Sequence, residues 1–338
     1  MKKEKDEKNA DPLASPVYER GDGAHLDQTL RPKTWDEYVG QAKVKENLRI
    51  LLTAARERGQ AAEHILLYGP PGLGKTTLAH LISGTLGTNM RVTSGPAIER
   101  VGDLAAILSN LSPGDILFID EIHRLPKTIE EVLYPAMESG VLDIIIGKGP
   151  SARTVQLDLP PFTLVAATTR VSLISAPLRS RFSGGTFRLE FYSDDEIVSI
   201  LDRSAKMLGV QTEKETLKGI ASRSRATPRT ANYLLKRARD LAQIEGADIS
   251  DDIVSRTFGL LDIDTLGLHG PDRQLLRAIV HKFNGGPVGL NTLAAATGEE
   301  MATIEDVLEP YLIRQGLIER TPRGRVATAA AHAHIQNT

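Results

Sequence analysis

The sequence predicts an α/β core with a parallel sheet, followed by an all-helical domain and a C-terminal winged-helix domain. Short apolar runs alternate with helical segments in the first half of the chain, which is typical of a doubly wound sheet. From Ser193 onward the apolar residues recur at helical spacing. After Gly270 the order of segments is helix, helix–turn–helix and hairpin, which is the order of a winged helix.

The composition is that of an ordinary globular protein. The chain has 338 residues, of which 41% are hydrophobic and 25% charged, and this excludes a wholly disordered or collagen-like chain. The lack of cysteine excludes disulfides and thiolate chemistry, and it fits a cytoplasmic location. Since the net charge is −2, any attraction to nucleic acid must be local, and no apolar run is long enough to predict membrane association.

The domain boundaries follow from changes in pattern along the chain. Residues 1–20 are rich in charge and are expected to form a disordered tail, with a short capping helix as the alternative. The α/β domain is expected over 21–189, the helical domain over 190–262 and the winged helix over 263–338. The final Ala/His-rich stretch is expected to fray.

Each element has its own local signal. Runs that are apolar on both faces predict buried strands over 65–68, 116–119 and 164–167. In the helical domain, Ser193 and Glu196 form a capping box and Gly209 ends the helix, while Thr227 caps a second helix that stops at Gly246. The winged helix is expected to contain helices over 272–283 and 290–297, a third helix ending at Gly316, and strands over 317–320 and 325–328.

The strongest motif is GPPGLGKT, which runs from Gly69 to Thr76 and matches a phosphate-binding loop at every fixed position. Gly69, Gly72 and Gly74 would let backbone N–H groups wrap phosphates at a helix N-terminus. Lys75 would reach the β- and γ-phosphates, and the Thr76 hydroxyl would bind Mg²⁺. The motif therefore predicts ATP and Mg²⁺ as ligands, with a chance glycine-rich turn as the alternative.

A second buried strand ends in two carboxylates, Asp120 and Glu121. Burying an unpaired carboxylate costs free energy, so two of them at the end of a buried strand indicate a functional role. We expect Asp120 to orient Mg²⁺ and Glu121 to act as the general base on water, although a strand end turning into solvent is the alternative. His123 and Arg124 are interpreted as surface residues. Thr169, at the end of the next apolar run, is a candidate to hold the attacking water, but threonine also commonly ends strands.

Arginines follow at positions suited to act between domains or subunits. Arg181 and its competitor Arg179 lie where a side chain can reach the γ-phosphate of a neighbouring subunit, with a surface salt bridge as the alternative. Arg229, near the start of a helix, can point from the helical domain toward the nucleotide. An arginine that acts in this way, an arginine finger, has no phosphate to contact within its own chain when it lies at the domain edge. Such a site therefore requires a ring of subunits.

The order of these motifs resembles that of AAA+ ATPases, and longer strings resemble the RuvB family of bacterial Holliday-junction branch-migration ATPases. The strings include YVGQ from Tyr38, LYPAME from Leu133, DLPPFTL from Asp158, GGPVGL from Gly285 and RTPRGR from Arg320. The resemblance covers about residues 25 to 330. It implies a P-loop (AAA+) core, a helical lid and a homo-hexameric ring, and it favours Arg181 over Arg179.

The resemblance also implies further nucleotide contacts. Leu30, Arg31 and Tyr38-Val39 would line the adenine side, and Tyr192 would approach the nucleotide from the lid. Residues 138–140 would approach the nucleotide of a neighbouring subunit. The expected nucleotide contacts are then Leu30, Arg31, Tyr38, Val39, Gly69, Gly72, Gly74, Lys75, Thr76, Thr77, Glu138, Ser139, Gly140, Arg181, Tyr192 and Arg229. Between Phe182 and Arg188 the chain is richer in glycine than the family leads us to expect, so the resemblance does not define the local loop after Arg181.

Two further surfaces are candidates for macromolecular contacts. Arg320, Arg323 and Arg325 surround a Pro/Gly turn, which favours contacts to DNA phosphates without base-sequence preference, and a solvated loop is the alternative. The consecutive Ile144, Ile145 and Ile146 cannot all face inward, so the segment predicts an inserted hairpin rather than a buried strand. The resemblance implies that this hairpin docks a RuvA-like junction-binding protein, and a RuvC-like resolvase is a further expected partner.

The function that fits best is an ATP-driven ring motor acting on double-stranded DNA at four-way junctions in recombination and repair. A nucleotide-gated DNA-binding regulator is the first alternative, but a switch needs no fast base at Glu121. A protein unfoldase would use an aromatic pore loop, yet residues 87–115 contain no Phe, Trp or Tyr. A clamp loader shares the pair Ser180-Arg181, but the appended winged helix argues against it.

Overall fold

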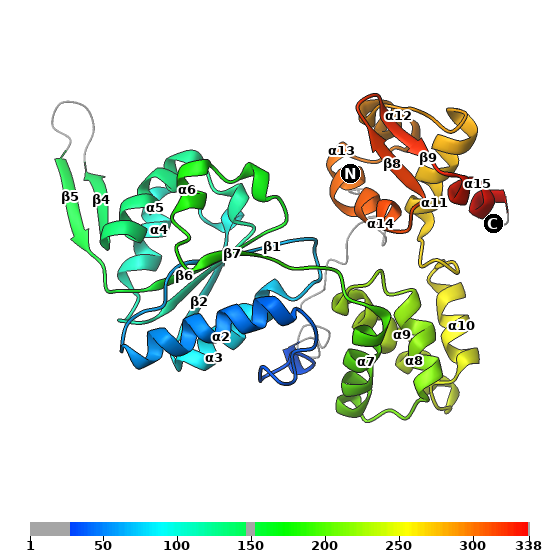
Figure 1. The fold of residues 1–338 in the computed structure, drawn as a ribbon, viewed down its shortest axis with the longest axis horizontal. Coiled ribbons are helices and arrows are strands. Elements are labelled where there is room, and N and C mark those ends of the chain that lie inside the picture. Colours follow the sequence, from blue (N-terminus) through cyan, green and yellow to red (C-terminus); the bar gives the residue numbers. More distant parts are fainter. Residues whose placement is uncertain (1–27, 147–152, 337–338) are drawn as a thin grey trace, which may run out of the picture.

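The computed structural model describes residues 28–146 and 153–336, so the predicted tail over 1–20 lies outside the described residues. Figure 1 shows an α/β unit on one side of the molecule and, on the other, a helical unit next to a smaller unit of helices and a hairpin. The predicted fold class is confirmed: a core with a parallel sheet is followed by a helical lid and a winged helix.

The sheet of the α/β unit contains five parallel strands in the order β2-β3-β6-β1-β7. Their bounds are β1 (Ile65–Tyr68), β2 (Met90–Ser94), β3 (Ile116–Asp120), β6 (Thr163–Thr168) and β7 (Gly185–Arg188). The three predicted strands are β1, β3 and β6, which form the middle of the sheet. The edge strands β2 and β7 are not among the predicted strands, because neither contains a buried residue and neither is therefore a continuous apolar run.

The glycine-rich link after Phe182, which the resemblance left undefined, contains strand β7. The backbone N–H of Gly184 donates to the carbonyl oxygen of His64 at 2.9 Å. A Cβ atom on Gly184 would lie 2.9 Å from the carbonyl oxygens of both Glu63 and His64. Glycine is therefore needed for the close approach that brings β7 beside β1.

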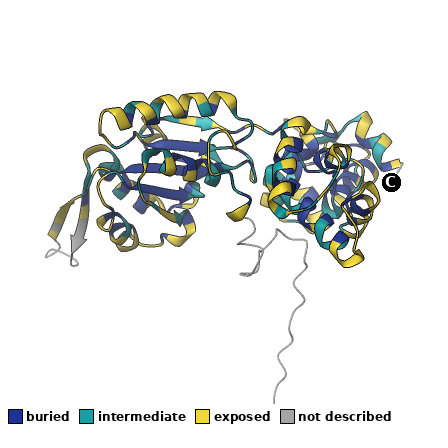
Figure 2. Cartoon of the chain, turned by 90° about the horizontal axis from the view of Figure 1, so that it is seen from below, coloured by how far each residue is buried: buried dark blue, intermediate teal, exposed yellow. Residues whose placement is uncertain are grey.

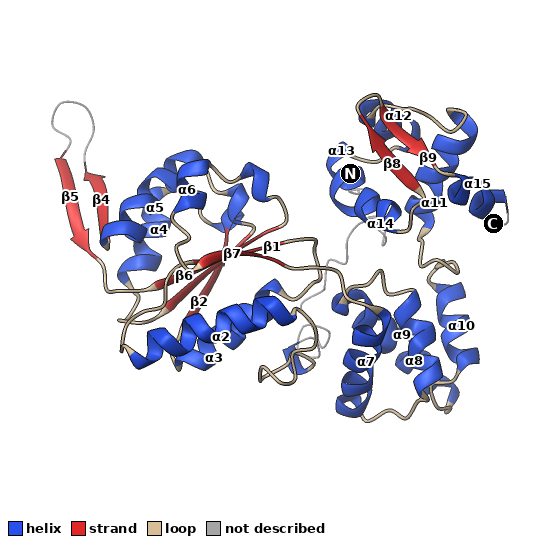
Figure 3. Cartoon of the chain, viewed as in Figure 1, coloured by secondary structure: helices blue, strands red, loops and turns tan. Residues whose placement is uncertain are grey.

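Helices cover both faces of the sheet (Figure 3). The helices are α2 (Ala42–Glu57) and α3 (Lys75–Leu86) on one face, and α4 (Val101–Ser109), α5 (Lys127–Ser139) and α6 (Ala176–Ser180) on the other. Successive strand residues point to opposite faces, so Ile65 and Leu67 pack toward α2 and α3, whereas Leu66 packs toward α4 and α5. Figure 2 shows the strands as the buried middle layer.

Short 3₁₀ helices connect several of these elements. They are η1 (Gly95–Ala97), η2 (Ile122–Arg124) and η4 (Val171–Leu173). The predicted hairpin is confirmed as an antiparallel pair of β4 (Val141–Ile146) and β5 (Arg153–Asp158). It projects from the α/β unit on the side away from the lid (Figure 1). The turn between the two strands lies outside the described residues.

The lid contains α7 (Asp194–Leu208), α8 (Lys214–Ser222), α9 (Pro228–Glu245) and α10 (Asp251–Leu260). The predicted capping box is confirmed, because the Ser193 hydroxyl accepts from the Glu196 N–H at 3.3 Å and the Glu196 carboxylate accepts from the Ser193 N–H at 2.8 Å. Gly209 and Gly246 end α7 and α9 in the left-handed conformation, as expected.

The winged helix is built around one compact core. Its elements are α11 (Gly270–Arg277), η5 (Ala278–Lys282), α12 (Leu290–Thr297), α13 (Met301–Thr303), η6 (Ile304–Leu308), α14 (Glu309–Arg314), β8 (Ile318–Thr321), β9 (Gly324–Ala327) and α15 (Ala329–Gln336). The expected fraying of the C-terminal stretch is wrong, since α15 buries Ala331 and Ile335 in this core. In the described part of the chain, no helix combines the length and apolarity needed to cross a membrane.

Candidate nucleotide-binding and catalytic site

The glycine-rich loop connects β1 to α3 and requires glycine at its fixed positions. Gly69 and Gly74 have φ angles of 144° and 95°, which favour glycine. A Cβ atom on Gly69 would lie 2.7 Å from the carbonyl oxygen of Leu189, and one on Gly74 would lie 3.1 Å from the Tyr38 hydroxyl. The loop leads directly into α3, whose first N–H groups carry the positive end of the helix dipole.

The Lys75 ammonium lies inside this loop. It donates to the carbonyl oxygens of Gly69 at 2.7 Å and Pro70 at 2.9 Å. Burial lowers the pKa of Lys75 to about 8, an effect that the nearby Asp120 and Glu121 carboxylates oppose. The side chain is therefore still cationic at neutral pH, as binding of a phosphate requires.

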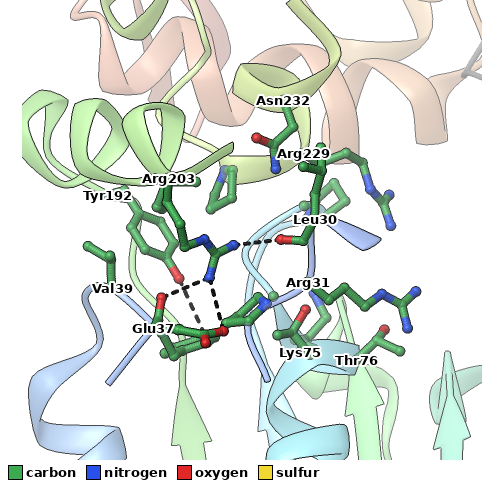
Figure 4. Close-up of a pocket in the computed structure, with 18 of the residues that line it drawn as sticks. Leu30, Arg31, Glu37, Val39, Lys75, Thr76, Tyr192, Arg203, Arg229 and Asn232 are labelled. Atoms are coloured by element: carbon green, nitrogen blue, oxygen red, sulfur yellow. Dashed lines mark hydrogen bonds and ion pairs between the residues drawn. The ribbon is translucent and has the colours of Figure 1, made fainter. Parts of the chain in front are cut away.

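One pocket between the loop and the lid brings most of the predicted residues together (Figure 4). The predicted residues that line it are Leu30, Arg31, Tyr38, Val39, Gly72, Gly74, Lys75, Thr76, Thr77, Asp120, Glu121, Thr169, Tyr192 and Arg229. Gly69 is the first residue of the same loop but is not among the residues that line the pocket. Arg181 and residues 138–140 lie outside the pocket.

Arg203, on α7, is a pocket residue that sequence reasoning missed. Its guanidinium donates to the carbonyl oxygens of Leu30 at 2.5 Å and Glu37 at 3.0 Å, and Figure 4 shows it reaching across to this segment. Burial lowers the pKa of Arg203 from its ordinary value. The only signal in the sequence is an arginine one turn after Ile200 on the buried stripe of the helix. Arg203 therefore fastens the N-terminal segment of the pocket to the lid.

Two buried tyrosines join the lid to the phosphate-binding loop. The Tyr192 hydroxyl lies 3.3 Å from the Tyr38 hydroxyl and donates to the carbonyl oxygen of Leu73 at 3.2 Å. Burial is the main cause that raises the pKa of both phenols, so they stay neutral. Both tyrosines line the same pocket as the acid pair.

The acid pair stands at the end of β3. Asp120 accepts the backbone N–H of Glu121 at 2.9 Å, and Glu121 has a left-handed φ of 50°. Burial is the main cause that raises the pKa of the Glu121 carboxyl, and the charge of Asp120 is the second. Thr76 and Asp120 supply hydroxyl and carboxylate oxygens, the donors that Mg²⁺ prefers. The described residues hold no cluster of three His, Cys, Asp or Glu, and Mg²⁺ bound with nucleotide phosphates needs none.

His123 is not a surface residue, so that interpretation is wrong. Its side chain is 8% exposed, with Nε2 3.4 Å from Oε2 of Glu121. The other ring nitrogen, Nδ1, lies 2.9 Å from the Thr168 hydroxyl. Burial lowers the pKa of His123, and the nearby Arg170 and Arg124 act in the same direction. Arg124 is exposed, as expected.

Arg181 lies at the edge of the α/β unit. Its guanidinium pairs with Glu138 at 2.9 Å, donates to the carbonyl oxygen of Pro177 at 2.7 Å and stacks 4.6 Å from the centre of the Tyr134 ring. Arg179 is exposed. Of the two candidates, Arg181 is thus held in a defined orientation, next to the segment 138–140 that was predicted to approach a neighbouring nucleotide.

The wing arginines differ from one another. Glu309, at the start of α14, is fully buried and forms ion pairs with both Arg320 and Arg325. Two of the three predicted DNA contacts, Arg320 and Arg325, are thus paired with a buried acid, and the phosphate contacts of all three stay predictions. Arg323, at the turn, is exposed, and within the described residues its side chain forms no hydrogen bond or ion pair.

The winged helix is attached to both other units. Arg225 of the lid donates to the buried Asp272 carboxylate at 2.7 Å and to the carbonyl oxygen of Val307 at 3.1 Å. On the α/β unit, Arg170 forms an ion pair with Asp306. Because Arg170 follows Thr169, this ion pair lies close to the acid pair of the pocket.

A phosphate-binding loop after β1, an acid pair at the end of β3 and a lid that closes the pocket define a P-loop ATPase of the AAA+ class. Family models match all of its units: the P-loop domain of the Holliday junction DNA helicase RuvB over residues 30–189, the RuvB AAA lid domain over 192–264 and the RuvB C-terminal winged helix domain over 265–336. The chain belongs to the RuvB family of Holliday junction branch-migration ATPases.

Individual relatives agree with this assignment. The Holliday junction branch migration complex subunit RuvB of Dehalococcoides mccartyi (strain CBDB1) is 57% identical over 315 residues, which is 93% of this chain and 90% of that protein. The solved structure of the Thermotoga maritima RuvB Holliday junction branch migration motor matches with a TM-score of 0.84 at 49% identity, over 91% of this chain and 99% of that chain. The resemblance inferred from the sequence strings is thereby confirmed.

Proposed function

We propose that this chain uses ATP hydrolysis to move double-stranded DNA through four-way junctions during recombination and repair. The observation that carries the proposal is the pocket between the loop and the lid. It places Lys75 and Thr76 of the loop, Glu121 of the acid pair and Arg229 of the lid around one cavity. A nucleotide bound there would contact both units that must move relative to each other.

The chemistry follows from the positions of these groups. Lys75 would bind the β- and γ-phosphates, while Thr76 and Asp120 would hold Mg²⁺, which supplies charge neutralisation. Glu121 would polarise the attacking water, and Thr169 on the neighbouring strand would hold that water in line with the γ-phosphorus. Catalysis of phosphoryl transfer is mostly positional and electrostatic, and these groups would supply the part of it that lies within one chain.

Movement would pass from the lid to the winged helix. Arg229 and Tyr192 line the pocket from the lid side, so we expect a change of nucleotide state to change the lid angle. The lid holds the winged helix through Arg225, whose partners are Asp272 and the carbonyl oxygen of Val307. An exposed arginine at the wing, Arg323, would contact DNA phosphates.

The active site would be shared between subunits. Arg181 and Glu138 lie outside the pocket of their own chain, with Ser139 and Gly140 beside them. An arginine in that place can complete the site of the next subunit, which a closed ring of identical subunits provides. From the resemblance to the family we expect that ring to be a hexamer.

The β4–β5 hairpin would dock a RuvA-like junction-binding protein, because it projects from the unit on the side away from the lid. Ile145→Asp should leave basal ATP turnover intact and abolish its stimulation by that protein. Ile50→Asp is the matched control, since Ile50 is 65% exposed on α2. Unchanged stimulation in the Ile145 variant would contradict the docking site. A RuvC-like resolvase is the further partner that the family suggests.

Branch migration of a synthetic four-way junction tests the whole proposal. The expected result is ATP-dependent conversion of the junction to duplex products, faster with the junction-binding protein present, and none with ADP. ATP hydrolysis and DNA binding without any junction movement would instead support the alternative of a nucleotide-gated regulator or a clamp-loader-like switch.

A further inference from the structure

His123 is a buried side chain that the proposed chemistry does not use, yet it lies between two parts of the catalytic site. On one side its Nε2 atom is 3.4 Å from the Glu121 carboxylate. On the other side its Nδ1 atom is 2.9 Å from the hydroxyl of Thr168, the residue before Thr169. The imidazole thus connects β3, which carries the general base, to β6, which carries the candidate for holding water.

The partners on the two sides of His123 favour one tautomer of its ring. The Thr168 hydroxyl accepts the backbone N–H of Arg170 at 2.9 Å, and it can still either donate to Nδ1 of His123 or accept from it. An ionised carboxylate can only accept, so Glu121 favours the tautomer in which Nδ1 accepts the Thr168 hydrogen. In a neutral imidazole the remaining proton is on Nε2, and this atom faces Glu121. The histidine therefore presents a donor to the carboxylate.

The backbone at Glu121 is held firmly, which leaves the direction of the carboxylate to its side-chain contacts. The Glu121 carbonyl oxygen accepts the Arg124 N–H at 2.9 Å. A Cβ atom on Gly95 would lie only 2.4 Å from that same oxygen, so the neighbouring segment packs closely against it. The Glu121 side chain itself is 35% exposed, and His123 lies 3.4 Å from its carboxylate. The other charges that act on it are those of Asp120, Lys75, Arg124 and Asp306.

We infer that His123 is a positioning residue that aims the Glu121 carboxylate at the attacking water by linking it to Thr168. The inference rests on the proposed role of Glu121 as general base. His123 is not among the residues that line the pocket, so it has no direct part in holding the nucleotide. Its loss should therefore lower kcat and leave nucleotide affinity unchanged.

Two polar variants separate the contact to Glu121 from the contact to Thr168. The amide of His123→Gln can place an N–H near the former Nε2 position, whereas the shorter His123→Asn reaches only the former Nδ1 position. In ATPase assays of the full-length protein, His123→Asn should lower kcat about tenfold to hundredfold, as expected for a misdirected catalytic group. His123→Gln should keep most of the activity, and the KM for ATP should stay within about twofold in both.

His64→Gln is the matched control, because His64 is another buried histidine bridging elements of the same unit, through Met137 and Leu164. It should lower the melting temperature without lowering kcat at a permissive temperature. Equal kcat losses in the Gln and Asn variants of His123, or a raised KM in place of a lowered kcat, would overturn the inference.

The Glu121→Gln background distinguishes failure of this inference from failure of the proposed general base. If Glu121→Gln alone keeps full turnover, the role of Glu121 itself is wrong. If it loses turnover, adding His123→Asn should cause no further loss, because His123 acts only through that carboxylate. A further loss by the same factor as in the wild-type background would contradict the inference alone.

Discussion

Replacing Arg325 with alanine should destabilise the winged helix, because it breaks a buried ion pair with Glu309. The Glu309 carboxylate is fully buried and accepts hydrogen bonds from Arg325 through Nε and, at 3.2 Å, through Nη2. The Arg325 side chain is 12% exposed, whereas that of Arg320, the second partner, is 47% exposed. In Arg325→Ala the buried Glu309 carboxylate therefore keeps one partner, Arg320, whose charge is largely exposed to solvent. Breaking a buried pair costs about 3–5 kcal/mol, and we expect about 3 kcal/mol because Arg320 remains.

Hydrogen exchange of the β8 and β9 amides, together with urea unfolding, measures this loss. Arg323→Ala is the matched control at the adjacent turn, with an expected change in unfolding free energy below about 0.5 kcal/mol. In binding to duplex DNA the order of the two effects should be reversed, with the larger loss of affinity in Arg323→Ala. Arg323→Ala should weaken DNA affinity and reduce the slope of log affinity against log salt by about 0.9 for each phosphate that the arginine neutralises.

Equal stability of the Arg325 and Arg323 variants would refute the role assigned to the buried pair. A variant that replaces Glu309 and Arg325 together with leucine gives a second check. Removal of both charges eliminates the orphaned carboxylate, so this double variant should recover much of the stability that Arg325→Ala removes. Failure to recover would mean that packing at Arg325, rather than its charge, stabilises the wing.

Other substitutions test separate parts of the account. Lys75→Ala should abolish ATP turnover, because the loop loses its phosphate-binding cation, and titration with a fluorescent nucleotide should show weakened binding. Glu121→Gln should bind ATP with unchanged affinity but stall, which trapping of the nucleotide-bound protein on DNA would reveal. Gly184→Ala should lower the melting temperature, since its new Cβ would lie 2.9 Å from two carbonyl oxygens; an unchanged melting temperature would contradict the close approach of β7.

The sequence predicted those parts of the molecule whose chemistry is local. The phosphate-binding loop and the acid pair are contiguous motifs, and β3 could be recognised because all but its last residue is fully buried. The edge strand β2 could not, because its mixed exposure gives no clear period. The order of elements in the winged helix and in the lid could be predicted, because residues typical of helix beginnings and ends are present in both.

The parts that could not be predicted depend on pairs of residues far apart in the sequence. The contact of Arg203 with the Leu30 carbonyl spans 173 positions, and that of His123 with Thr168 spans 45. A surface histidine and a buried one look alike in a single sequence, because burial is decided by the strand that packs against it. The pairing of Arg325 with Glu309 was hidden for the same reason, since a basic turn has the same local pattern whether or not a buried acid lies beneath it.

A mixing experiment tests most directly whether one chain completes the site of the next. Lys75→Ala subunits cannot bind ATP productively but keep Arg181, whereas Arg181→Ala subunits bind ATP but lack the arginine for their neighbour. Each variant alone should be inactive, and random equal mixing should restore intact sites at about a quarter of the subunit junctions. Turnover near that fraction is the predicted result. Mixed rings that form normally yet show no turnover above the separate variants would contradict a shared active site.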